Sequence, residues 1–119
     1  MKPVKLRITL ASKTASAILY NNSTSKDFIS LLPLTLTLED YNNTEKVANL
    51  SKKLSTKNTP IGFKPSAGDL TYYLPWGNIA LFYKDFDYAI GLISLGKITI
   101  GLEYFNTKNS TTVTIALET

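Results

Sequence analysis

Three stretches of this chain alternate apolar and polar residues with a period of two. Residues 4–10 place four aliphatic side chains on one face and charged or hydroxyl side chains on the other, and residues 34–38 and 111–117 follow the same pattern. Successive side chains of a strand point to opposite faces, whereas a helix buries residues three or four apart. The chain is therefore predicted to consist mainly of half-buried β-strands.

Further strand-like runs lie between these stretches and are separated by turn residues. They cover residues 15–20, 46–50, 70–74, 79–83 and 93–102. An Asn-Asn pair follows the first of them, and the sequence PWGN joins the third to the fourth. Seven or eight short strands in 119 residues are typical of one domain with a sandwich or barrel architecture.

One helix is predicted after the turn at residues 21–22. Thr24 and Asp27 have the spacing of a capping box, with Asp in place of the usual Glu or Gln. Apolar residues follow at helical spacing, namely Phe28, Leu31 and Leu32. Pro33 ends the helix because a proline forces the preceding residue out of the helical region.

Residues 51–67 are predicted to form a long connection, rich in Ser, Thr and Lys and containing two prolines. Such connections are uncommon in compact domains and are often functional. A short helical turn near residues 51–54 is an alternative there. The connection also carries most of the lysines of the basic stretch 46–64, which we interpret as a solvated loop, with an anionic ligand or partner as the alternative.

The chain contains no cysteine and no histidine. This excludes disulfides and thiolate catalysis, and it removes the commonest metal ligand and the commonest general base. Asp85 and Asp87 flank Phe86, so in an extended segment they would point to opposite sides, and we interpret them as a solvated turn rather than a catalytic pair. We therefore expect no catalytic residues, no metal site and no cofactor.

The net charge of +4 comes with twelve lysines and only one arginine. Nucleic-acid sites favour arginine for bidentate contacts, so this bias argues against a nucleic-acid partner. No window approaches the roughly twenty apolar residues of a membrane-spanning helix. The N-terminal segment alternates instead of forming the apolar core of a signal peptide. We expect a cytoplasmic protein if the chain is complete and an exported one if a leader has been removed.

Several segments together resemble the small bacterial cyclophilin-like domains. They read LLPLTLTLED at 31–40, YYLPWGN at 72–78, LFYKDF at 81–86 and GLISLGKI at 91–98. The resemblance implies a closed antiparallel β-barrel of about eight strands capped by one helix, with residues 1–119 as a single domain. Relatives occur alone or beside other domains, including flavodoxin-like ones, and the family has no common activity.

True cyclophilins are peptidyl-prolyl isomerases, and their activity depends on an arginine in a strand after the first helix. Here that strand, at residues 34–38, contains no arginine, and the pocket histidine of those enzymes is missing as well. The sole arginine, Arg7, lies on the polar face of the first strand. These departures favour binding over catalysis.

Eight of the thirteen aromatic residues fall between Phe63 and Tyr88. Tyr72 and Tyr73 lie on opposite faces of one strand, and the next strand repeats this arrangement, so one residue of each pair is expected to fill the barrel. Trp76 sits in a turn, where it either packs back over the barrel mouth or binds a partner. The candidate binding residues are Trp76, Tyr73, Asn78, Phe82, Tyr83 and Phe63.

The function that these residues favour is a non-catalytic module that binds a small ligand or an extended peptide at the barrel mouth. One alternative is a weak peptidyl-prolyl isomerase, which rests on fold analogy alone. Another is an accessory domain for a flavodoxin-like redox partner, which rests on the domains found beside relatives.

Overall fold

The computed structural model describes residues 3–118; residues 1, 2 and 119 lie outside the described part. Its strands are β1 (Val4–Leu10), β2 (Lys13–Leu19), β3 (Leu34–Tyr41), β4 (Glu45–Asn49), β5 (Asp69–Tyr73), β6 (Asn78–Phe82), β7 (Leu92–Ile100) and β8 (Thr111–Leu117). Two helical elements accompany them, the α-helix α1 (Ser23–Ile29) and the 3-10 helix η1 (Leu102–Phe105). None of the helices described here is long and apolar enough to cross a membrane.

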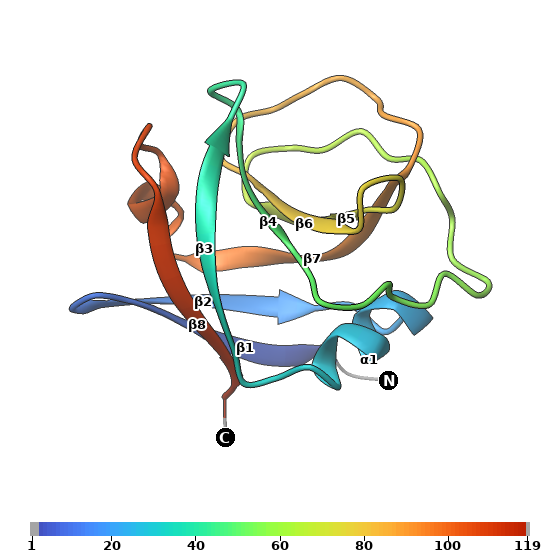
Figure 1. Cartoon of the computed structure of the whole chain (residues 1–119), viewed down its shortest axis with the longest axis horizontal. Helices are drawn as coiled ribbons and strands as arrows, with labels where there is room; N and C mark the ends of the chain where they lie inside the picture. Colours follow the sequence, from blue (N-terminus) through green and yellow to red (C-terminus); the bar gives the residue numbers. More distant parts are fainter. Residues whose placement is uncertain (1–2, 119) are drawn as a thin grey trace.

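The strands form a closed barrel in the order β1-β2-β7-β5-β6-β4-β3-β8, as Figure 1 shows. Neighbouring strands run antiparallel all the way round. The predicted mainly β architecture, an eight-stranded barrel with one α-helix, is confirmed. The order places β1 and β6 on opposite sides of the barrel.

The barrel interior follows from the alternation seen in the sequence. In β1, Leu6, Ile8 and Leu10 are buried in the core, whereas Arg7 points outward and is exposed. In β3 the same register sends three leucines inward and the intervening threonines outward. The outward threonines of β3 pair through their hydroxyls with threonines of β8. Burial of the aliphatic faces supplies the main stabilisation of the barrel.

One end of the barrel is closed by α1, which links the end of β2 to the start of β3. Phe28 of this helix is fully buried in the core. The predicted capping box is wrong, because the helix starts earlier and Asn22 is its N-cap, accepting a hydrogen bond from the Ser25 backbone at 2.8 Å. Asp27 instead accepts a hydrogen bond from the backbone of Ser55 and pairs with Lys52, and so fixes the long connection to the helix.

The opposite end of the barrel is closed by η1 and by a buried lysine. Phe105 of η1 is fully buried in the core, and Lys46 of β4 has no exposed surface. Side chains therefore fill both ends of the barrel. The element η1 was not predicted from the sequence, and the predicted starts of β4, β5, β6 and β7 each lie one residue too late.

Two long connections cross the outer surface of the barrel. Residues 50–68 leave β4 at the α1 end and reach β5 at the other end, and residues 83–91 return from β6 to the start of β7. The two connections meet where Phe63 and Ala89 form an isolated β-bridge. Residues 51–52 form a bend and residues 53–54 have no regular structure, so the alternative helical turn is absent there.

Candidate functional site

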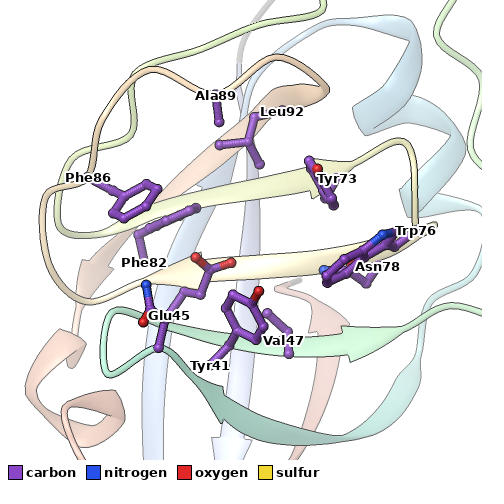
Figure 2. A pocket seen from close by; sticks show the side chains of 11 residues that line it. Tyr41, Glu45, Val47, Tyr73, Trp76, Asn78, Phe82, Phe86, Ala89 and Leu92 are labelled. Carbon is purple, nitrogen blue, oxygen red and sulfur yellow. The ribbon is translucent and has the colours of Figure 1, made fainter.

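A pocket of about 280 Å³ opens on the outer face of the barrel, over β4, β5 and β6 (Figure 2). It is lined by Tyr41, Asn42, Glu45, Val47, Tyr73, Trp76, Asn78, Phe82, Phe86, Ala89 and Leu92. The strands supply the floor, while the turn at Trp76 and the connection that carries Phe86 supply the walls. Most of the lining is aromatic or aliphatic, with few polar groups.

Strand alternation explains why this pocket lies outside the barrel. Tyr72 and Ile79 point inward and belong to the main core, whereas their neighbours Tyr73 and Asn78 point outward and line the pocket. The pocket therefore does not lie at the barrel mouth, where we expected the binding site. The core fills the interior and both ends, so the lining residues lie on the outer face of β4, β5 and β6.

Three aromatic rings meet on one side of the pocket. The Trp76 ring lies edge-to-face with Tyr73, at 5.4 Å between centroids, and with Tyr41, at 6.1 Å. Trp76 keeps 64% of its surface exposed, so it does not pack fully over the barrel. On the other side, Phe86 stacks on the buried Phe82 at 6.2 Å. The rings therefore form two aromatic walls.

Glu45 is the one charged residue that the described part of the chain contributes to the lining. It pairs laterally with Tyr41 on β3 and with Phe82 on β6, and Figure 2 shows its carboxylate between these two aromatic side chains. Among residues 3–118, no hydrogen bond or ion pair to this carboxylate is found. Burial without a partner disfavours the charged form and raises the pKa of Glu45 from 4.5 to about 7.

Asn78 contributes an amide to the wall of the pocket. Its side chain is buried, and its Nδ2 donates to the Ile79 carbonyl at 3.0 Å. Its Oδ1 is buried and has no hydrogen-bond partner within the described part of the chain. Buried polar atoms are nearly always paired in folded proteins, so an unpaired acceptor beside a pocket is an unusual and costly feature.

Comparison with known proteins identifies the fold family. The model of the cyclophilin-like family matches residues 8–116. The chain belongs to the cyclophilin-like family. No curated protein sequence matches it.

Among solved structures, the cyclophilin-like domain is similar to the solution structure of a hypothetical protein from Archaeoglobus fulgidus. The TM-score is 0.68 with 17% sequence identity, over 96% of this chain and 94% of the archaeal one. At this identity the likeness concerns the fold alone.

Four of the six candidate residues line the pocket of the cyclophilin-like domain: Tyr73, Trp76, Asn78 and Phe82. The other two lie elsewhere. Phe63, in the connection 50–68, packs against Phe82 and Leu92 and lines a smaller hollow of about 170 Å³ with Tyr20 and Pro60. Tyr83 follows β6 and is buried at the end of the barrel, where its hydroxyl donates to Asp40.

Tyr41, Glu45 and Phe86 also line the pocket but were not predicted from the sequence. Glu45 faces Phe82 only because β4 pairs with β6, and this pairing joins segments far apart in the chain. The sequence around Glu45 does not indicate that its side chain is buried, because Val47, two residues later, also faces outward. Asp69 caps the turn before β5, accepting a hydrogen bond from the Ser66 backbone at 2.7 Å.

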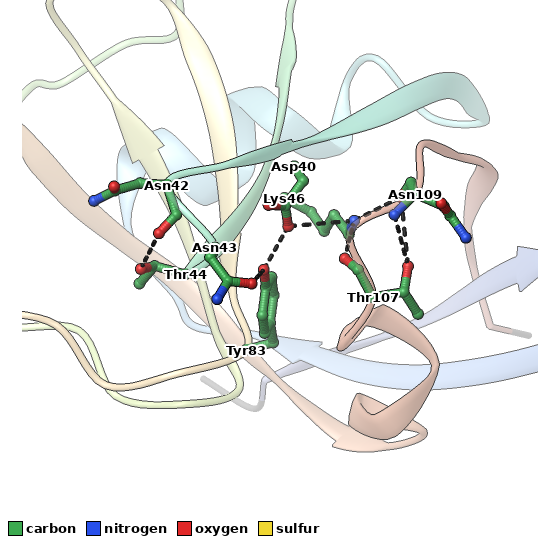
Figure 3. A network of polar contacts seen from close by, with 8 residues as sticks. All are labelled: Asp40, Asn42, Asn43, Thr44, Lys46, Tyr83, Thr107 and Asn109. Atoms are coloured by element: carbon green, nitrogen blue, oxygen red, sulfur yellow. Dashed lines mark hydrogen bonds and ion pairs between the residues drawn. The ribbon is translucent and has the colours of Figure 1, made fainter.

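Lys46, next to Glu45 in the chain, points to the other face of β4 and lies in a separate network (Figure 3). Its ammonium donates to the carbonyls of Thr107, at 2.5 Å, and Asn109, at 2.6 Å, and lies 3.4 Å from Asp40. Burial alone would raise the pKa of Asp40, but hydrogen bonds and charge from Tyr83 and Lys46 lower it below its usual value. Lys46 is therefore a structural cation rather than part of the solvated basic loop that we expected.

The same network affects Tyr83. Burial, together with the adjacent Asp40 carboxylate, raises the pKa of Tyr83 to about 12. The phenol therefore stays neutral and acts as a hydrogen-bond donor to Asp40 at physiological pH.

The only arginine of the cyclophilin-like domain lies far from this pocket. Arg7 is exposed on β1, which lies across the barrel from β6. The pocket therefore lacks an arginine that could face a prolyl amide. Its lining offers aromatic faces, one carboxylate and two amides, a set suited to recognising a ligand's shape and charge.

Proposed function

We propose that this cyclophilin-like domain is a non-catalytic binding module whose ligand occupies the outer-face pocket. The observation that carries the proposal is the unpaired Glu45 carboxylate inside an aromatic-walled pocket that the fold has already formed. Ligand sites are typically concave and mostly apolar, with a few polar groups that fix orientation. A half-buried charge without a partner lowers stability, so its presence needs a compensating role.

A small ligand fits this pocket better than an extended peptide. Its volume of about 280 Å³ lies near the lower end of ligand pockets, which span roughly 300–1,000 Å³. The barrel is closed, so a peptide has no free sheet edge to extend. The prolyl isomerase and the accessory redox domain stay predictions from fold analogy.

The proposal is tested by screening a library of small polar and aromatic compounds for thermal stabilisation. A compound at a hundred times its Kd stabilises the folded state by about 2.7 kcal/mol, which raises the melting temperature by several degrees. Because Trp76 is the only tryptophan, true pocket ligands should also change its fluorescence emission.

The matched variants are Trp76→Ala and Tyr88→Ala, since Tyr88 is an equally exposed aromatic residue outside the lining. We expect Trp76→Ala to abolish the stabilisation by hits while Tyr88→Ala retains it. The proposal fails if the library yields no compound that needs Trp76.

A further inference from the structure

We propose that the pocket selects an organic cation, a small molecule that carries a methylated ammonium group. This inference rests on the proposed function and names the chemical class of its ligand. Charge, ring geometry and hydrogen-bonding capacity each support it.

The charge of the pocket is complementary to a cation. Within residues 3–118, Glu45 is the only charged lining residue, and no lysine or arginine of this part reaches the lining. The neighbouring Lys46 cannot serve as a counter-ion, because its ammonium points to the other face of β4 and is held there by Asp40 and two backbone carbonyls. A bound cation would supply the charge partner that Glu45 lacks and offset the cost of its burial.

The ring geometry also suits a cation. Trp76 lies nearly perpendicular to both Tyr41 and Tyr73, at interplanar angles of 84° and 85°. Rings at right angles present their electron-rich faces in different directions, as in aromatic cages. A cation over the face of Trp or Tyr, within about 6 Å of the centroid, is attracted by the ring quadrupole, and quaternary ammonium groups are bound in this way.

Hydrogen-bonding capacity favours a methylated ammonium over a primary one. A primary ammonium carries three N–H donors that all need acceptors. The lining is mostly aromatic and aliphatic, and the acceptor of Asn78 that lacks a partner is closed off from solvent. Methyl groups bury their apolar surface against the rings and need no acceptors, so the charge is met by Glu45 and the ring faces.

The titration of Glu45 gives the proposal a pH dependence. The other titratable groups near this carboxylate are Tyr41 and Glu39 on β3, Tyr73 on β5 and Tyr83 after β6. The ion pair of Lys46 with Asp40 lies on the other face of β4. With a pKa of about 7, the carboxylate is mostly protonated at pH 6 and mostly charged at pH 8. Cation affinity should therefore rise about tenfold between these values.

The test compares choline with its uncharged isostere 3,3-dimethyl-1-butanol at pH 8. Binding is measured by isothermal calorimetry and by Trp76 fluorescence. We expect choline to bind at least about tenfold more tightly than the alcohol, which corresponds to the loss of one charge interaction. The variant Glu45→Gln should reduce choline affinity by a similar factor and remove its pH dependence. The control Glu103→Gln, an exposed carboxylate in η1, should leave both unchanged.

The outcomes of this test separate the cation assignment from the proposed function. Equal binding of the two probes, or tighter binding of the alcohol, would overturn the cation assignment while leaving a ligand pocket in place. Choline affinity that survives Glu45→Gln would do the same. Absence of binding by both probes would also overturn the cation assignment. The proposed function would then be decided by the library screen and by whether the hits need Trp76.

Discussion

Replacing Glu45 by glutamine should stabilise the protein above neutral pH. The glutamine side chain keeps the size of the glutamate and stays neutral at every pH. In the wild type, the folded state holds this carboxylate half-buried and unpaired, whereas the unfolded chain exposes it to water. The folded state therefore pays a desolvation cost whenever the group is ionised.

The direction of this stability effect, and the pH range over which it appears, follow from the pKa values of Glu45 in the unfolded and folded states. The unfolded chain releases the proton near 4.5 and the folded protein near 7, so wild-type stability falls as pH rises through this range. A shift of that size corresponds to roughly 3 kcal/mol for a fully buried group, at about 1.4 kcal/mol per pH unit. Because Glu45 is only half-buried, solvent screening reduces the expected effect to about 1–2 kcal/mol.

The assay is urea denaturation of wild type and Glu45→Gln at pH 5 and pH 8. We expect the variant to be more stable at pH 8, with a gain that exceeds the gain at pH 5 by about 1 kcal/mol. Glu39→Gln is the matched control, because this exposed carboxylate lies on the neighbouring strand. An equal gain at both pH values, or a variant that is less stable at pH 8, would refute the reasoning.

Three further substitutions test the fold. Lys46→Met leaves Asp40 and two carbonyls without their buried cation and should cost about 3–5 kcal/mol of unfolding free energy, measured by urea denaturation. Gly96→Ala would place a Cβ 1.8 Å from the Ile18 carbonyl oxygen and should lower the free energy of unfolding by on the order of 3 kcal/mol. The control Lys97→Ala, on the same strand, should change it little. Asn22→Ala should lower stability by about 1 kcal/mol, and Asn22→Asp, which keeps an N-cap acceptor, should lose less in the same assay.

The fold could be predicted from the sequence because the patterns that indicate it lie within short segments of the chain. The alternation in β1, β3 and β8 needs no knowledge of strand partners, and the turn at residues 75–78 marks the hairpin of β5 and β6. The helix was located, but its cap was misassigned. Asn22, Thr24 and Asp27 can all accept backbone hydrogen bonds, and tertiary contacts to residues 52 and 55 decided which one capped the helix.

Only part of the pocket lining could be predicted from the sequence. Four of the predicted binding residues line the pocket together because they share one hairpin and an aromatic-rich segment, namely Tyr73, Trp76, Asn78 and Phe82. Glu45 was not found, because its burial depends on the non-local pairing of β4 with β6 and on a connection that crosses the outer face. The sequence could not place this pocket on the outer face, because sequence alone does not show that core side chains fill both ends of the barrel.

The most direct test of the proposed pocket is an amide-resolved NMR titration of isotope-labelled protein with the compound that stabilises it most in the library screen. We predict that shift changes concentrate on strands β4, β5 and β6 and on the turn at Trp76, and that they disappear in Trp76→Ala. Shift changes that concentrate instead around the smaller hollow at Tyr20 and Phe63 would contradict the account.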